Sequence, residues 1–136
     1  MLLQLNVTTD YAIRIVMYLA IQQKVVNSRE IAKEMGIPMT YIMKITKKLK
    51  DAKLLSEKRG VDGGFMLNKA PDRLTLLDIV GALEKTVKIN RCLEDDEYCS
   101  RDAVAFCTVR KLLVQLQAEF AEGLNVKISD LISSSC

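Results

Sequence analysis

Apolar side chains recur at helical spacing in two stretches near the start of the sequence. Residues 8–23 open with two threonines that can cap a helix and then place apolar residues three and four positions apart, which predicts a first helix ending near Gln23. A second helix of about two turns is predicted between the cap Asn27 or Ser28 and Gly36, which can adopt the left-handed conformation that stops a helix.

A third helix is predicted directly after this glycine, with Pro38 in its first turn. One face of that helix is apolar and consists of Ile42, Ile45, Leu49 and Ala52. The remaining positions are mostly polar or cationic and comprise Thr40, Tyr41, Met43, Lys44, Lys47 and Lys48. Such a helix fits the major groove of duplex DNA, where threonine and lysine reach base edges and flanking lysines reach phosphates.

Two short strands are predicted after the third helix, over residues 54–58 and 65–68. The turn between them, residues 59–64, is rich in glycine, which tolerates positive φ, and Arg59 lies near its tip. A guanidinium on such a β-wing can enter a narrow minor groove. A basic helix alone is usually a solvated surface and a glycine-rich hairpin alone is weak evidence, but in this order they predict a winged helix-turn-helix that binds DNA.

The charge of the chain is divided between two halves of opposite sign. Residues 1–70 hold 12 Lys and Arg against 6 Asp and Glu, a net of +6, whereas residues 71–136 hold 8 against 11, a net of −3. Between residues 44 and 59, seven basic side chains stand against two acidic ones. This concentration of cations suits phosphate contacts, and from charge alone a solvated helix face is an equal alternative.

Length and composition narrow the class of protein. The chain has 136 residues, of which 49% are apolar and 27% charged, as is typical of one ordinary domain. Its longest apolar run, residues 15–21, is far shorter than the roughly 18 residues of a membrane span and lacks a signal-peptide pattern, so we expect a cytoplasmic protein without a membrane anchor. Histidine, a phosphate-cradling motif and a Cys-x2-Cys pair are all absent, and we therefore do not expect an enzyme.

Cys92, Cys99 and Cys107 stand in one segment that interrupts the helical pattern. Thiols in a loop can converge on one point, and sulfur ligands favour zinc, copper(I) or an iron-sulfur cluster. The gaps between the cysteines lack the paired spacing of a structural zinc site. Two observations count against a cluster: three thiols fall short of the four ligands that a two-iron cluster usually has, and residues 94–97 add four negative charges beside the thiols. Inert or redox-exchanging thiols are the alternative. Cys136 follows three serines and is interpreted as incidental.

A long amphipathic helix is predicted between Asp102 and Gly123. Its apolar positions are Ala105, Val109, Leu112, Leu116 and Phe120, with Leu113 alongside. The helix could pack on its own domain, but a two-fold operator needs a two-fold protein, and we favour a homodimer formed through this helix. The expected fold is mainly α with a small β-wing, divided into a DNA-binding domain (1–85), a cysteine-containing cofactor loop (86–108) and a dimerisation helix with a C-terminal segment (109–136).

Short motifs run along nearly the whole chain. They are Thr9-Asp10-Tyr11-Ala12, Ile31-Ala32, Gly36-Ile37-Pro38, Tyr41, Leu49, Leu54-Leu55-Ser56, and in the wing Arg59-Gly60 and Gly63-Gly64-Phe65-Met66-Leu67. In this order they resemble the family of small winged-helix repressors that includes the iron-sulfur cluster regulator IscR, the nitric-oxide sensor NsrR and the cysteine-metabolism repressor CymR. The resemblance implies a homodimeric transcription regulator, often a repressor, that binds a pseudo-palindromic operator.

The resemblance also implies roles for individual residues. Thr40, Met43 and Lys44 match positions where the recognition helix meets bases, and Arg59 matches the position where the wing meets the minor groove. The full set of expected DNA-contacting residues is Ser28, Thr40, Tyr41, Met43, Lys44, Lys47, Lys48, Arg59, Gly60 and Gly63.

Cluster-binding members of this family carry three cysteines before the dimerisation helix, as Cys92, Cys99 and Cys107 do here. In the nitric-oxide branch an aspartate near the start of helix one of the other subunit can complete the site, and Asp10 occupies that place. The cysteine gaps here are longer than is usual in the family, and Arg110 stands near the histidine ligand of the IscR branch, which favours the nitric-oxide branch. The expected metal ligands are therefore the three cysteines and Asp10, and the expected cofactor is an iron-sulfur cluster, two-iron rather than four-iron.

Two alternatives remain open at this point. The first is a regulator of the same fold without a cluster, in which the cysteines exchange thiols or a metabolic enzyme binds the C-terminal half. The second is a thiol- or metal-handling protein whose basic helix binds nucleic acid without sequence preference.

Overall fold

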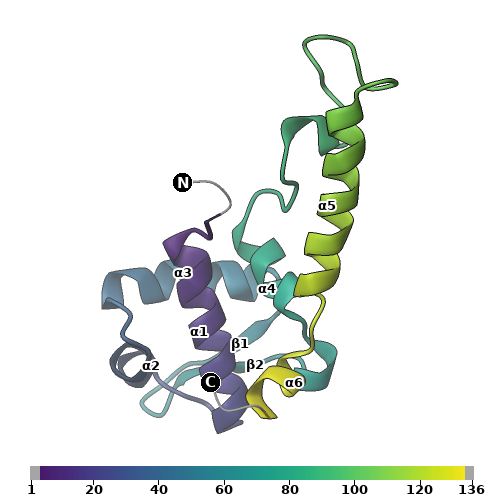
Figure 1. The fold of residues 1–136 in the computed structure, drawn as a ribbon. Coiled ribbons are helices and arrows are strands. Elements are labelled where there is room, and N and C mark those ends of the chain that lie inside the picture. Colours follow the sequence, from purple (N-terminus) through teal and green to yellow (C-terminus); the bar gives the residue numbers. More distant parts are fainter. Residues whose placement is uncertain (1–3, 134–136) are drawn as a thin grey trace.

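Most of the elements in the described part of the chain are helices, and two short strands pair there in an antiparallel sheet (Figure 1). The computed structural model describes residues 4–133, so the interpretation of Cys136 lies outside the described residues. The elements are α1 (Val7–Gln22), α2 (Ser28–Met35), α3 (Met39–Asp51), β1 (Leu55–Lys58), β2 (Gly64–Leu67), η1 (Pro71–Arg73), α4 (Leu76–Leu83), η2 (Arg91–Leu93), α5 (Thr108–Leu124) and α6 (Ile128–Ser133). This is the predicted mainly α fold with a small β-wing.

Helix α1 is the central element of the core. It packs against α2, α3, α4 and α6, and its buried positions Ile15, Val16 and Leu19 follow the predicted stripe. The helix ends where predicted, because Gln23 adopts a left-handed conformation with φ of 51°. The cap was predicted wrongly: the Asn6 side chain, not a threonine, accepts the hydrogen bond from the Thr8 N–H at 3.0 Å.

Helices α2 and α3 meet at a tight turn, as expected of a helix-turn-helix. Asn27 caps α2 by accepting the Glu30 N–H at 2.9 Å, and Gly36, with φ of 64°, ends it. The Glu30 carboxylate does not close a capping box; it accepts a 2.6 Å hydrogen bond from the Tyr18 hydroxyl, which ties α2 to α1. The turn thus joins α2 to α3, and the Tyr18–Glu30 hydrogen bond joins α2 to α1.

The core-facing side of α3 matches the prediction in its first three members. Ile42, Ile45 and Leu49 are buried, whereas Ala52 lies beyond the last helical residue and is exposed. Thr46 takes the fourth buried place, because its hydroxyl donates to the Ile42 carbonyl at 2.7 Å and thus hides its polar group.

Strands β1 and β2 form the wing, with Leu55 opposite Leu67 and Lys58 opposite Gly64. Phe65 also pairs with Val26 in an isolated bridge, which fixes the wing to the α1–α2 connection. A Cβ atom at Gly64 would lie 2.2 Å from the Val26 carbonyl oxygen, so this close approach requires glycine. The base of the wing is therefore held in place by the core.

The end of the chain returns to the N-terminal core. Helix α6 contacts α1 and η1, and the fully buried Ile128 donates its N–H to the Leu74 carbonyl at 2.8 Å. Thr75 and Asp78 form a reciprocal capping box at the start of α4, beside this contact. Residues 125–133 thus fold with the N-terminal half of the chain.

Helix α5 extends away from the rest of the molecule, with residues 84–107 running alongside it as an irregular segment (Figure 1). The helix begins at Thr108, later than the predicted Asp102, because Cys107 acts as its cap. Within residues 4–133, every helix is too short or too polar to span a membrane.

Candidate nucleic-acid interface and cysteine segment

The side of α3 that faces away from the core carries most of the predicted DNA-contacting residues. Thr40, Met43, Lys44 and Lys47 are exposed, and Lys48 is half-exposed. Helices α1, α2 and α4 and strand β1 pack against the other sides of α3. This outward side is therefore the part of α3 that is free to enter a groove of DNA.

Tyr41 is placed differently from the other predicted contacts. It is half-buried, and its ring meets the Tyr11 ring edge-on, with centroids 5.3 Å apart and an interplanar angle of 79°. The Arg14 guanidinium lies 5.2 Å from the centroid of the Tyr11 ring on the same helix. Tyr41 thus fixes α3 to α1, and its contact with DNA stays a prediction.

Two glycines shape the turn that presents Arg59. Gly60 has φ of 112°, and the Gly63 N–H donates to the Gly60 carbonyl at 3.0 Å. A Cβ atom at Gly63 would lie 2.3 Å from the Lys58 carbonyl oxygen. Both positions therefore need glycine for the backbone, and Arg59 is left exposed at the side of the turn.

A groove of about 540 Å³ separates α3 from the wing. It is lined by Met43 of α3, by Ser28 at the start of α2, and by Lys58 and Arg59 of the wing. Glu57 is the acidic residue in the groove, and its 2.6 Å ion pair with Lys50 lowers the pKa of its carboxyl. The groove therefore brings Met43 of the predicted helix contacts together with the predicted wing contacts Arg59, Gly60 and Gly63.

A second hollow, on the other side of α3, brings together cations that are distant in sequence. Lys44 and Lys48 line it together with Lys85, which follows α4, and Thr8 of α1. Sequence reasoning missed Lys85, because only the packing of α4 against α3 brings it near the recognition helix. The one sequence signal was that Lys85 is the first cation after Arg73, at the expected end of the DNA-binding domain.

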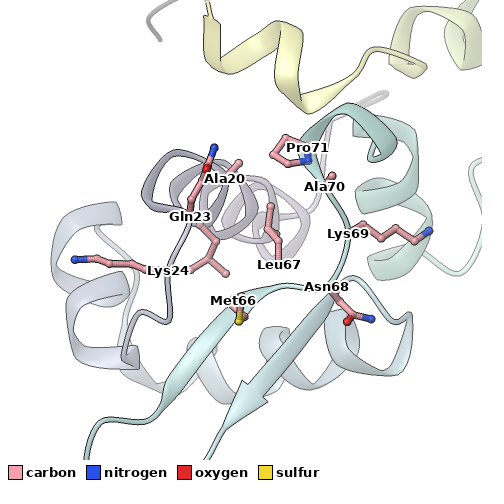
Figure 2. A pocket seen from close by; sticks show the side chains of 10 residues that line it. Ala20, Gln23, Lys24, Met66, Leu67, Asn68, Lys69, Ala70 and Pro71 are labelled. Carbon is pink, nitrogen blue, oxygen red and sulfur yellow. The ribbon is translucent and has the colours of Figure 1, made fainter.

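Figure 2 shows a separate hollow between the end of α1 and the chain that leaves the wing. Met66, Leu67 and Pro71 line one side of it and Gln23 and Lys24 line the other. None of the predicted DNA-contacting residues lines it among the parts of the chain that the structure describes. The hollow thus lies apart from the candidate interface.

The three loop cysteines occupy distinct local environments. Cys92 lies in η2, where the Asn90 side-chain amide donates to its sulfur at 3.2 Å, and Cys107 caps α5 by accepting the Arg110 N–H at 3.4 Å. Backbone N–H groups of Ala103 and Arg101 hydrogen-bond to the Cys99 sulfur and lower the pKa of that thiol. All three cysteines are free and half-buried, so each sulfur is partly accessible.

The predicted metal ligands are not gathered by one chain. Within residues 4–133, the structure contains no group of three Cys, Asp or Glu side chains placed to hold a metal ion. Asp10 lies in the first turn of α1 and forms a 2.8 Å ion pair with Arg14. The donor types fit an iron-sulfur cluster, but a single subunit does not assemble them.

Polar side chains that sequence reasoning missed anchor the start of the cysteine segment. The Thr9 hydroxyl, which is fully buried, donates to the Glu84 carboxylate at 2.6 Å. Gln117 of α5 accepts the Ile89 N–H at 2.7 Å and donates to the Val87 carbonyl at 3.0 Å. Gln117 is one of two glutamines on α5, with Gln115, so the sequence did not single it out as the anchor.

The apolar stripe of α5 faces outward instead of covering its own domain. Val109 and Leu112 are more than half exposed, and Leu116 and Phe120 are 41% and 39% exposed. Ala105 lies before the helix and is exposed. A contiguous exposed apolar stripe of this kind is typical of an interaction surface.

The fold is shared with solved structures of transcription regulators. The structure of CymR (YrzC), the global cysteine regulator of B. subtilis, matches with a TM-score of 0.80 and 24% identity, covering 99% of this chain and 100% of that chain. T. potens IscR matches with a TM-score of 0.78 and 20% identity, covering 98% of this chain and 89% of that chain. These likenesses confirm the winged helix-turn-helix fold.

Sequence comparison identifies relatives and a family. The transcriptional repressor NsrR of Streptomyces coelicolor is 27% identical over 97% of this chain and 90% of its own length. An Aquifex aeolicus protein, assigned by name to the HTH-type transcriptional regulators, is 32% identical over 93% of this chain and 89% of its own length. The model of the Rrf2 family, described as iron-dependent transcriptional regulators, matches residues 5–134. The chain therefore belongs to the Rrf2 family of transcriptional regulators, which are not enzymes.

Proposed function

We propose that the chain is a cytoplasmic, homodimeric repressor that binds a two-fold operator in duplex DNA, with an affinity set by an iron-sulfur cluster. The observation that carries the DNA-binding part is the groove between α3 and the wing, beside which α3 exposes cationic side chains. Lys44 and Lys47 project from the helix, and Arg59 projects from the wing across the groove. A helix of this kind reads base edges in the major groove while the wing reaches the neighbouring minor groove.

The exposed stripe on α5 supports the homodimer. A single winged helix reads only one half-site, so two subunits related by a two-fold axis are needed to read a palindrome. The apolar side chains of the stripe lie on the element that stands farthest from the DNA-binding part (Figure 1). Pairing two such helices would leave both recognition helices free.

The donor chemistry of the cysteine segment supports the cofactor. Cys92, Cys99 and Cys107 would hold the cluster, and Asp10 of a second subunit is our candidate for the fourth ligand. When bound, a two-iron cluster would supply a redox-active iron centre that nitric oxide or oxidants could modify. Backbone N–H groups lower the pKa of the Cys99 thiol, which favours a thiolate ligand. The ion pair of Asp10 with Arg14 uses Oδ2 of the carboxylate.

The segment that holds these thiols is connected to the DNA-binding part by defined contacts. Glu84 accepts the Thr9 hydroxyl, and Thr9 lies two residues before Tyr11, which packs on Tyr41 of α3. A change in the position of the segment at Glu84 therefore acts on the start of α1 and, through the tyrosine pair, on α3. To alter operator occupancy a hundredfold, the two states need differ by about 2.7 kcal/mol in DNA binding.

The test is anaerobic purification followed by visible absorption spectroscopy and determination of iron and sulfide per chain. We expect charge-transfer bands with matching iron and sulfide, lost in Cys92→Ala and retained in Cys136→Ala, the matched control. A colourless protein that resists anaerobic reconstitution would contradict the cluster and favour control by thiol exchange or by a metabolic-enzyme partner. Equal affinity for selected and random duplexes at physiological salt would instead contradict operator recognition.

A further inference from the structure

Two methionines stand out on the recognition helix because the rest of its outward side is polar or cationic. Met39 is 47% exposed and Met43 is 57% exposed, although methionine is usually a core residue. They are one helical turn apart, so their side chains share one side of α3. Single exposed apolar residues are ordinary, but this pair lies in the first half of α3, where a recognition helix meets base edges.

The surroundings of Met43 are those of a nucleic-acid interface. Met43 lines the groove between α3 and the wing, together with Ser28, Lys58 and Arg59. Lys44 and Lys47 are exposed on the same helix. Met43 is thus an apolar side chain with cations beside it on both the helix and the wing. In this position it can contact an apolar group of DNA while the cations contact the phosphates.

Duplex DNA offers one such group in the major groove, the C5-methyl of thymine. The thioether side chain of methionine donates no hydrogen bond, accepts one only weakly, and adapts its shape through three rotatable bonds. It is therefore better suited to covering a methyl group than to reading a donor or acceptor pattern. We propose that Met39 and Met43 make this chain select thymine by its methyl group at one or two positions of each half-site. The proposal rests on the proposed function and names the chemical group by which that interface discriminates.

The test compares thymine with deoxyuridine, which differs only by the methyl group. Duplexes are first selected by the purified protein from a random-sequence library, and each thymine of the selected site is then replaced in turn by deoxyuridine. Binding is measured by fluorescence anisotropy at physiological salt. At one or two positions per half-site we expect the dissociation constant to rise about fourfold, the effect of losing one buried methyl group.

Variant proteins separate this contact from general effects on affinity. Met43→Ala or Met39→Ala should bind thymine and deoxyuridine sites equally at the position that each side chain covers, because the partner of the methyl group is gone. Alanine at these exposed helix positions preserves the fold. Met66→Ala is the matched control, because Met66 is an exposed methionine that lines the separate hollow of Figure 2 and should keep the fourfold ratio.

The outcomes distinguish the two proposals. Selective binding with no deoxyuridine effect at any thymine, or an effect that persists unchanged in both methionine variants, would overturn methyl recognition and leave operator binding intact. Failure to enrich any sequence from the library would overturn operator recognition, and methyl recognition with it.

Discussion

The apolar stripe of α5 allows the proposed dimer to be tested by one substitution, Leu112→Asp. Leu112 is 53% exposed in the single chain, so a dimer interface has about half of its surface left to bury. Full burial of a leucine contributes about 1.5–3 kcal/mol, which makes the remaining half worth about 1 kcal/mol per subunit. Because a two-fold interface contains the residue twice, truncation alone costs the dimer about 2 kcal/mol.

Aspartate adds a second cost at the same place. A carboxylate buried without a partner is unfavourable by at least about 1 kcal/mol in each subunit. The total is at least about 4 kcal/mol, which raises the dissociation constant of the dimer about a thousandfold. Two half-sites would then be bound independently, so affinity for the palindrome should fall as well.

Analytical ultracentrifugation over a range of protein concentrations measures this shift. Val114→Asp is the matched control, because Val114 is 45% exposed on the same helix but lies about 140° around it from Val109. Both variants place aspartate in the helix, and because leucine is the better helix former the intrinsic cost is slightly larger for Leu112→Asp; circular dichroism monitors the helix content of both. Equal dimerisation of Leu112→Asp and the parent, equal weakening by Val114→Asp, or a parent that stays monomeric would refute the reasoning.

Three further predictions concern binding, titration and stability. Lys48→Ala should reduce the slope of log affinity against log salt concentration by about 0.9, because it removes one phosphate contact. Lys44→Ala should weaken the binding free energy by about 1–3 kcal/mol on a selected site and by less on random DNA. The pH midpoint for alkylation of Cys99 by iodoacetamide should be lower in the native chain than in the urea-unfolded chain, because native backbone N–H groups lower the pKa of the thiol; an equal or higher midpoint contradicts this. The hydrogen bond to Glu30 raises the pKa of Tyr18 to about 12. Since the unfolded value is about 10, the stability that Tyr18→Phe removes should be constant from neutral pH to pH 10 and vanish between pH 10 and 12, as measured by urea unfolding at each pH.

The DNA-binding half was predictable from sequence because its signals are local. Asn27 and Gly36 act as caps through their own side chain or backbone, and the apolar spacing of α1 and α3 needs no distant partner. The wing followed from its glycines, since close backbone approach at Gly63 and Gly64 excludes other residues. Features of this kind depend on neighbouring residues, so they can be predicted from a single sequence.

Features that depend on distant contacts could not be predicted in the same way. Ile128 joins the core only because α6 folds back onto η1 and α1, a contact between segments more than fifty residues apart. Thr46 is buried because a hydrogen bond to its own helix hides the hydroxyl, and that choice depends on what α3 packs against. The start of α5 was predicted too early. Ala105 fits the apolar spacing of the helix, but it lies in a segment before the helix that forms turns.

The acidic run at residues 94–97 raised an objection to a cluster, because four negative charges disfavour thiolates nearby. The structure reduces that objection, since Arg91 forms a 2.6 Å ion pair with Asp96, and Arg110 contacts Glu97 at 3.3 Å. The same Arg110 donates to the Cys92 carbonyl at 3.3 Å, so a cation lies between the acidic run and the cysteines. Arg110→Gln should therefore weaken retention of an iron-sulfur cluster more than Lys111→Gln, its neighbour on α5. Equal iron content in the two variants after anaerobic purification would show that the acidic charges do not act on the thiols.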